Sequence, residues 1–169
     1  RSTDARPLVT ILPGSRIQEV NLNLHGFLKA AALIAQEVPE TRFAIASFNE
    51  EQAEIARKQV EASDLSVDVL VNRTGELIEA SHCCLACSGS VSLELMYYAK
   101  PSVIHYRVGR LSYAIGRSLI RVRYMTLVNL LACEDRFDMK QAPYHPDQPS
   151  AQLVPFPEFP TYQDRSAEL

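Results

Sequence analysis

The stretch Ser88-Gly89-Ser90-Val91-Ser92-Leu93-Glu94 lies between an apolar run of strand character and an apolar run of helix character. Cys83–Cys87, before it, has the length of a buried strand, and Val91–Ala99 suits a helix. A turn of small residues at such a junction leaves unpaired backbone N–H groups at a helix start, where a phosphate can bind. Glu94 follows about one turn later and could accept hydrogen bonds from a ribose diol. The alternative is an ordinary turn with Ser88 as N-cap and a solvated Glu94.

A second junction of the same kind follows the apolar run Leu8–Leu12, where Pro13-Gly14-Ser15-Arg16 precedes a helix. The serine of this turn and Gln18 have the spacing of a capping box, which predicts that the serine opens the helix. The arginine then lies in the first turn, where the helix dipole disfavours a cation unless an anion shares the site. Its planar guanidinium suits a diphosphate, and the alternative is a surface ion pair with Glu19. Two such turns favour a nucleotide site.

Length and composition indicate one globular domain. The 169 residues, of which 47% are hydrophobic, suffice for a genuine core. A net charge of −3 argues against a nucleic-acid partner. No apolar run has the length of a membrane span, and no signal peptide opens the sequence. Because the sequence begins at Arg1 rather than Met, we expect it to be a piece of a longer protein.

The cysteines predict buried thiols rather than a metal site. Cys83 and Cys84 are adjacent on a predicted strand, so their side chains point to opposite faces. Cys87 and His82 lie close by, but the sequence has no second Cys/His pair at the spacing of a zinc finger. We therefore expect no metal, and thiols held in a reducing cytosol.

Strand-like and helix-like runs alternate along the chain. The predicted strands are Leu8–Leu12, Arg42–Ser47, Ser66–Val71, Cys83–Cys87, Ser102–Tyr106 and Tyr124–Leu127; the predicted helices are Ile17–Gln36, Glu50–Glu61, Gly75–Ala80, Ser90–Ala99 and Arg110–Ile120. This alternation predicts a Rossmann-like α/β fold, a parallel sheet of about six strands with helices on both faces. Ligands of such sheets bind beyond the carboxyl ends of the strands, where both turns lie.

Residues 1–140 form the predicted domain, and residues 141–169 form a proline-rich tail. Six of the ten prolines lie between Pro143 and Pro160, which predicts an extended arm over the surface. Gln163–Leu169 has the composition of the start of a helix. In the helix before the tail, a basic stripe of Arg110, Arg117 and Arg121 could attract an anionic membrane surface. The alternative for this stripe is a solvated helix face.

Five motifs occur in order between Leu8 and Asp138. They are Leu12-Pro13-Gly14-Ser15-Arg16, Glu19-Val20, Ala86-Cys87-Ser88-Gly89-Ser90-Val91-Ser92-Leu93-Glu94, Tyr106-Arg107 and Asn129-Leu130-Leu131-Ala132. Together they resemble the lipid-A-disaccharide synthases, a family of GT-B glycosyltransferases, in their C-terminal, nucleotide-sugar-binding half. The combination of PGSR-x-x-EV with SGS-x-S-LE carries the resemblance. The chain departs from the family in Cys87 and Ser90, where Ala and Thr are usual, in Val128, where Pro is usual, and in its proline-rich tail.

The resemblance implies an inverting hexosyltransferase that moves a diacylglucosamine unit from UDP to a lipid-linked glucosamine 1-phosphate. It implies a UDP-2,3-diacylglucosamine donor, a lipid monosaccharide acceptor, and a cytoplasmic enzyme peripheral to the inner face of the bacterial inner membrane. We expect no cofactor or metal, because backbone N–H groups, a helix end and Arg16 would stabilise the leaving diphosphate. The general base is expected in an N-terminal half, so we assign no catalytic residue here and expect this piece alone to be inactive.

The expected nucleotide-sugar site gathers residues from both turns and from two later segments. Backbone N–H groups from Gly89 to Val91 and Arg16 would bind the diphosphate, and Glu94 would bind the ribose. The loop Asn72–Gly75 is the candidate for the uracil, and Asn129 would face the donor from the sixth strand. The full set is Gly14, Ser15, Arg16, Thr74, Ser88, Gly89, Ser90, Val91, Glu94 and Asn129.

Two other classes of protein remain possible at this point. The first is another GT-B enzyme of UDP-sugars, such as a UDP-N-acetylglucosamine 2-epimerase or a muramyl glycosyltransferase. An epimerase needs catalytic carboxylates and histidines that flank the sugar, and the chain shows no such set near these turns. The second is a non-enzymatic flavodoxin-like binding or receiver domain. A receiver needs an acidic cluster after its first strand and an Asp after its third, where this chain has Pro13-Gly14-Ser15 and Asn72.

Overall fold

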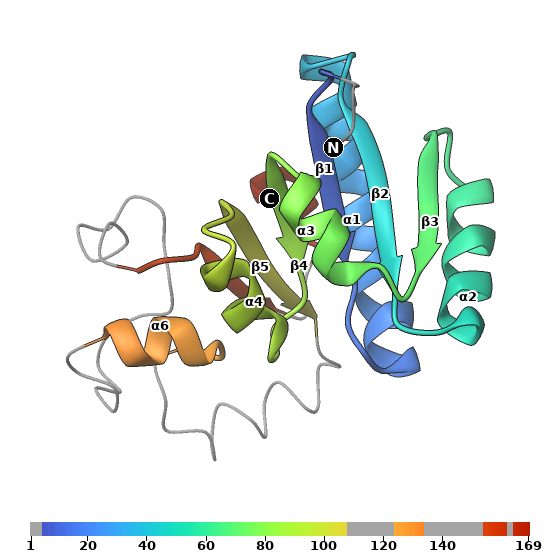
Figure 1. Cartoon of the computed structure of the whole chain (residues 1–169). Coiled ribbons are helices and arrows are strands. Elements are labelled where there is room, and N and C mark those ends of the chain that lie inside the picture. The colour runs from blue at the N-terminus through green and yellow to red at the C-terminus, as the bar shows by residue number, and fades with distance from the viewer. Residues whose placement is uncertain (1–4, 108–123, 134–153, 162–163) are drawn as a thin grey trace.

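A computed structural model describes residues 5–107, 124–133, 154–161 and 164–169 (Figure 1). The strands are β1 (Leu8–Leu12), β2 (Arg42–Ser47), β3 (Val67–Val71), β4 (Cys83–Ala86), β5 (Ser102–Arg107) and β6 (Glu158–Thr161). The helices are α1 (Ile17–Glu37), α2 (Glu50–Glu61), α3 (Thr74–Ala80), α4 (Val91–Tyr97) and α6 (Leu127–Ala132), with a 3₁₀ turn, η2, at Ser166–Glu168.

The six strands form one parallel sheet in the order β3-β2-β1-β4-β5-β6. This is the strand order of the Rossmann fold, so the predicted fold class is confirmed. The order reverses between β1 and β4, where Leu12 pairs in register with Ala86. The two turns singled out in the sequence follow these strands directly and therefore lie together at the carboxyl edge of the sheet.

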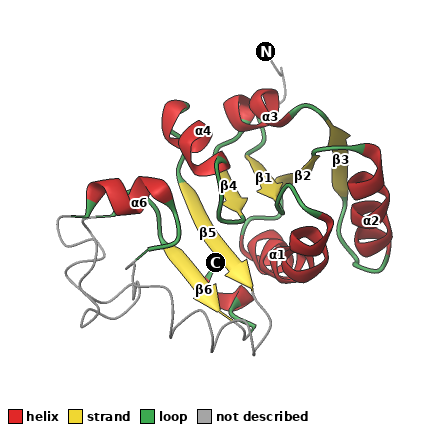
Figure 2. Cartoon of the chain, turned by 90° about the horizontal axis from the view of Figure 1, so that it is seen from below, coloured by secondary structure: helices red, strands yellow, loops and turns green. Residues whose placement is uncertain are grey.

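Helices cover both faces of the sheet, as Figure 2 shows for α1 and α2 on one side and α3 and α4 on the other. Alternate residues of each strand enter opposite cores because successive side chains point to opposite faces. Ile11 packs with α1 and α2, whereas Leu12 packs with α3, α4 and α6. Cys83 and Cys84 divide in the same way, as their adjacency predicts.

The prediction of a sixth strand at Tyr124–Leu127 is wrong. Leu127 is the first residue of helix α6, and the sixth strand is Glu158–Thr161, which pairs with β5. Glu158 is 1% exposed, and its carboxylate accepts hydrogen bonds from the Met125 and Thr126 backbone N–H groups and from the Thr126 hydroxyl at 2.8 Å. These bonds hold the residues before α6 against β6. The short apolar run at Tyr124–Leu127 does not by itself indicate that Glu158 is its partner.

The proline-rich tail also differs in part from the arm expected over the surface. Residues 158–161 are extended, but they join the sheet at its edge, where a strand tolerates proline. Phe156 and Phe159 are buried there. The boundary between residues 140 and 141 lies outside the described residues and stays a prediction. Of the predicted terminal helix, the structure describes residues 164–169, which contain only the turn η2.

The predicted helix Arg110–Ile120, with its stripe of Arg110, Arg117 and Arg121, lies outside the described residues. The membrane contact proposed for that stripe therefore stays a prediction. Among the helices that the structure does describe, none combines the length and the apolar character that crossing a membrane requires.

Candidate functional site

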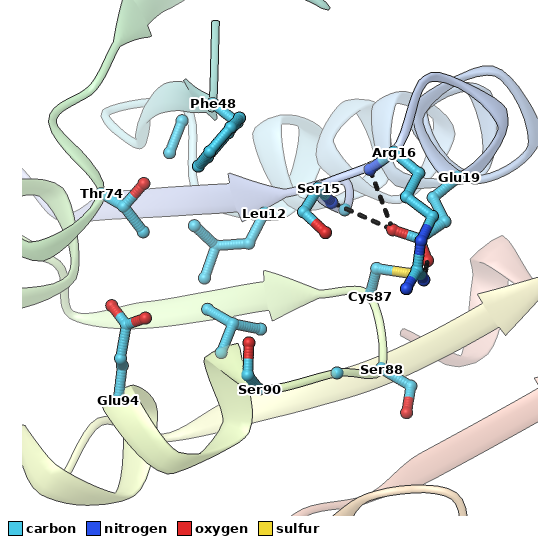
Figure 3. A pocket seen from close by; sticks show the side chains of 14 residues that line it. Leu12, Ser15, Arg16, Glu19, Phe48, Thr74, Cys87, Ser88, Ser90 and Glu94 are labelled. Atoms are coloured by element: carbon cyan, nitrogen blue, oxygen red, sulfur yellow. Dashed lines mark hydrogen bonds and ion pairs between the residues drawn. The ribbon is translucent and has the colours of Figure 1, made fainter.

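A cleft of about 440 Å³ lies beyond the carboxyl ends of β1 to β4, at the point where the strand order reverses (Figure 3). Its volume is within the range of small-molecule sites, and the position is the usual one for ligands of this sheet. It is lined by Leu12, Gly14, Ser15, Arg16, Glu19, Ala46, Phe48, Thr74, Cys87, Ser88, Gly89, Ser90, Val91 and Glu94. Nine of the ten residues predicted from the sequence are in this set.

The turn after β1 is built around Gly14, which has a φ of 119°. A Cβ at this position would lie 2.6 Å from the Cβ of Glu19 and 2.7 Å from its Oε2. Glycine is required here twice, because other residues are strained at this φ and because the space is already filled. The turn therefore places its backbone directly against the carboxylate of Glu19.

Glu19 binds the backbone of this turn from inside the first turn of α1. Its Oε2 accepts hydrogen bonds from the backbone N–H groups of Ser15 at 3.0 Å and Arg16 at 3.2 Å. Arg16, not the predicted Ser15, is the N-cap residue, because Glu19 rather than Gln18 reaches back to the turn. These two donors at the α1 end are thus already satisfied by a carboxylate of the protein.

Arg16 makes the ion pair with Glu19 that was the alternative in the sequence, and its contact with a diphosphate stays a prediction. Its Nη1 donates to Oε1 of Glu19 at 2.8 Å, and the residue also lines the cleft. The Arg16 side chain is 78% exposed, whereas that of Glu19 is 11% exposed. One N–H group of the guanidinium is therefore bound by the buried carboxylate of Glu19. The other N–H groups of the guanidinium are exposed and can donate to a ligand.

The turn after β4 differs because its donors are open. Ser92 donates from its N–H and its hydroxyl to the carbonyl of Gly89, at 3.2 Å and 2.9 Å. Among the residues that the structure describes, none accepts a hydrogen bond from the N–H groups of Gly89, Ser90 or Val91. Gly89 has a φ of 153° with open space where a Cβ would stand. This turn can accept an anion without displacing an internal partner.

Side chains from α4, α3 and β2 complete the cleft. Figure 3 shows the Ser90 hydroxyl directed into it and the Ser88 hydroxyl directed away. The exposed Glu94 of α4 extends toward Thr74, which begins α3. Ser90, rather than Ser88, is the N-cap residue of α4. The cleft thus combines open backbone donors, one cation and one free carboxylate at separate positions.

Asn129 is the predicted site residue that the structure does not bring to the cleft. It belongs to helix α6, not to a strand, and has no exposed surface. Its Nδ2 donates to the Phe156 carbonyl at 2.8 Å and to Glu158 Oε2 at 3.1 Å, and its Oδ1 accepts from the Phe156 N–H at 3.1 Å. In this structure Asn129 holds the tail against α6.

Sequence reasoning missed the apolar part of the lining and the role of Gln52. Phe48 directly follows β2, so its place at the carboxyl edge was a usable signal. Gln52 is 2% exposed and donates from Nε2 to the Ser15 carbonyl at 2.7 Å, while its Oε1 accepts from the Phe48 N–H at 3.2 Å. It connects the turns after β1 and β2, and no pattern of adjacent residues reveals that bridge.

The cysteines are free; Cys84 and Cys87 are buried, as predicted, whereas Cys83 and Cys133 are half-buried. Burial raises the pKa of Cys84 to about 11 and that of Cys87 to about 12, so both thiols stay protonated at neutral pH. Within the described ranges, no cluster of three or more His, Cys, Asp or Glu side chains could hold a metal ion. The expectation of a metal-free site stays a prediction.

The family model and the similar curated proteins indicate the same family. The sequence model of lipid-A-disaccharide synthetase matches residues 2–142. Lipid-A-disaccharide synthase of Psychromonas ingrahamii is 33% identical over 127 residues, which are 74% of this chain and 33% of that protein. The enzyme of Actinobacillus pleuropneumoniae is 34% identical over 134 residues, 78% of this chain and 34% of its own.

The chain thus spans about a third of the length of these curated relatives. The enzyme of Colwellia psychrerythraea aligns over 95% of this chain, at 28% identity and 41% of its own length. Among solved structures, Staphylococcus aureus MnaA with UDP covers 96% of this chain and 44% of its own, with a TM-score of 0.47 and 14% identity. On the family match and the two relatives above 30% identity, this chain belongs to the lipid-A-disaccharide synthetase family.

Proposed function

We propose that this chain is the donor-binding part of a lipid-A-disaccharide synthase, a GT-B glycosyltransferase. The whole enzyme would transfer a diacylglucosamine unit from UDP to a lipid-linked glucosamine 1-phosphate, with inversion at the anomeric carbon. The observation that carries the proposal is the cleft at the sheet's switch point, where the family's two motifs meet. Family membership selects this reading over the epimerase and the receiver domain.

The diphosphate would bind between the turn after β4 and Arg16. The N–H groups of Gly89, Ser90 and Val91 have no internal acceptor within the described part, and Arg16 keeps donors free on the same cleft. Charge that develops on the leaving UDP would be stabilised by these preorganised donors. The proposal therefore needs no metal ion or other cofactor. The Ser15 and Arg16 N–H groups are not part of it, because Glu19 occupies them.

Glu94 would accept hydrogen bonds from the ribose hydroxyls, and Thr74, the first residue of α3, would contact the base. Both residues line the cleft, and the Glu94 carboxylate makes no ion pair among the described residues. The general base and the acceptor site would belong to an N-terminal half of the enzyme. Asn129 is left out of this proposal because it is buried against the tail.

The proposed enzyme would work at the surface of the bacterial inner membrane, because its donor and acceptor carry acyl chains, and the proposal places it on the cytoplasmic side. Arg110, Arg117 and Arg121 would attract the anionic lipid surface. Binding of the chain to anionic and to neutral vesicles tests this part. The contact is abandoned if replacement of the three arginines leaves binding to anionic vesicles unchanged.

Calorimetric titration with UDP tests the site. Arg16→Ala should weaken UDP binding by about 1.5–3 kcal/mol, the range of a hydrogen bond to a charged group. Arg57→Ala is the matched control, because Arg57 is also a partly exposed arginine paired with a glutamate but lies on α2 away from the cleft. Equal UDP affinity of both variants and the unaltered chain would return Arg16 to a surface role.

The ribose contact is tested with 2′-deoxy-UDP. Glu94→Gln should reduce the preference for UDP over the deoxy analogue, because the carboxylate that accepts from the ribose hydroxyl is lost. An unchanged ratio of the two affinities would show that Glu94 does not contact the ribose.

An assay of disaccharide synthesis separates binding from turnover. The 169-residue chain should bind UDP weakly and form no product until an N-terminal half is supplied. Turnover by the chain alone contradicts the placement of the base.

A further inference from the structure

Phe48 is an exposed aromatic side chain on the wall of the cleft. It directly follows β2, is 63% exposed, and lines the same cavity as Thr74 and Glu94. Figure 3 shows its ring on the side of the cleft opposite Ser90 and Glu94, near Thr74. The proposed function assigns the diphosphate and the ribose to the turn after β4, Arg16 and Glu94, so this ring has no partner in it as it stands.

The backbone of Phe48 is held more firmly than its exposure suggests. Its N–H donates to the buried Gln52 at 3.2 Å, and Gln52 donates to the Ser15 carbonyl at 2.7 Å. Gln52 is itself fixed at the start of α2, because its N–H donates to the Asn49 side chain at 2.9 Å. The turn that carries the ring is thus tied to the turn after β1, which carries Arg16. A flat surface in a fixed position relative to a phosphate site can select a ligand by its shape.

We propose that the Phe48 ring is a stacking platform for the planar base of the nucleotide. This inference rests on the proposed nucleotide-binding function and adds the residue that recognises the face of the base. Any aromatic base has a π-face, so the contact selects a planar ring and not one particular base. Thr74, the first residue of α3, lines the same cleft and would contact the edge of the same base.

The probe that isolates stacking is 5,6-dihydro-UDP, which keeps the ribose, the diphosphate and the polar edge of uracil but has a puckered, non-aromatic ring. The unaltered chain should prefer UDP over this analogue. Phe48→Leu should lower the affinity for UDP about 5- to 10-fold, within the range of base–aromatic stacking, and leave that for dihydro-UDP nearly unchanged. Phe48→Tyr should retain the preference, because it keeps the aromatic face.

Tyr97→Leu is the matched control, since Tyr97 is an exposed aromatic residue of α4 that does not line the cleft. Thermal unfolding of each variant confirms that the fold is intact. The platform is refuted if Phe48→Leu binds both ligands as the unaltered chain does. It is also refuted if the two affinities fall equally, because Phe48 would then support the turn and not the base. Failure of the unaltered chain to bind UDP at all would instead overturn the proposed function.

Discussion

Replacement of Glu19 by alanine is the sharpest test of how the turn after β1 is built. The Glu19 carboxylate accepts two hydrogen bonds from the backbone of this turn and one from the Arg16 guanidinium. Loss of a capping acceptor costs about 0.5–2 kcal/mol, and leaving part-buried donors unpaired costs about 1–3 kcal/mol. The ion pair adds only about 0–1 kcal/mol, because the arginine side chain is 78% exposed.

These contributions overlap, so we expect Glu19→Ala to lower the free energy of unfolding by about 2–3 kcal/mol. Glu19→Gln keeps the size and one acceptor oxygen and should cost about half as much. Urea denaturation followed by circular dichroism measures both values. Glu50→Ala removes the carboxylate of an exposed pair with Arg57 and should cost no more than about 1 kcal/mol. If Glu19→Ala is no more costly than this control, the carboxylate does not support the turn.

Three further outcomes follow from the packing and burial of single groups. Gly14→Ala should destabilise the chain more than Gly89→Ala in the same denaturation assay, because both have a positive φ but only Gly14 has a filled Cβ position; equal losses would contradict this. Burial lowers the pKa of His105 to about 4, so stability should fall as pH drops from about 6.5 toward 4, where only the unfolded chain gains the proton. His105→Leu should flatten that slope in chemical denaturation, and an unaltered slope would assign it to other groups. Alkylation by iodoacetamide at pH 8 should spare Cys84 and Cys87 in the native chain, since burial keeps both thiols protonated, and rapid labelling would show that they are accessible.

The first five strands and the helices between them could be predicted from the sequence because local pattern and tertiary packing agree there. Arg42–Ser47 and Glu50–Glu61 have the bounds that were predicted, and α1 extends one residue further than expected. Each of these elements is bounded by a turn residue or a proline and has a continuous apolar face. Because parallel strands share a carboxyl edge, the sequence also placed the turns of Gly14 and Gly89 together correctly.

The parts that could not be predicted depend on contacts between distant residues. Tyr124–Leu127 is a short apolar run whose state depends on Glu158, a residue more than 30 positions away. Asn129 has the residue type of a ligand-binding group, but its polar atoms are used by Phe156 and Glu158. Local spacing contains none of this information.

The late position of β6 in the chain has a consequence for the order of folding. Strands β1 to β5 lie within one contiguous segment, whereas about 50 residues separate the end of β5 from the start of β6. Closing a connection of that length costs roughly 1 kcal/mol more in chain entropy than closing a crossover of a dozen residues. Contacts between distant segments also form slowly. During synthesis, a five-stranded sheet with the cleft already at its edge can therefore assemble first, and the tail joins as the last strand once Glu158 reaches the start of α6.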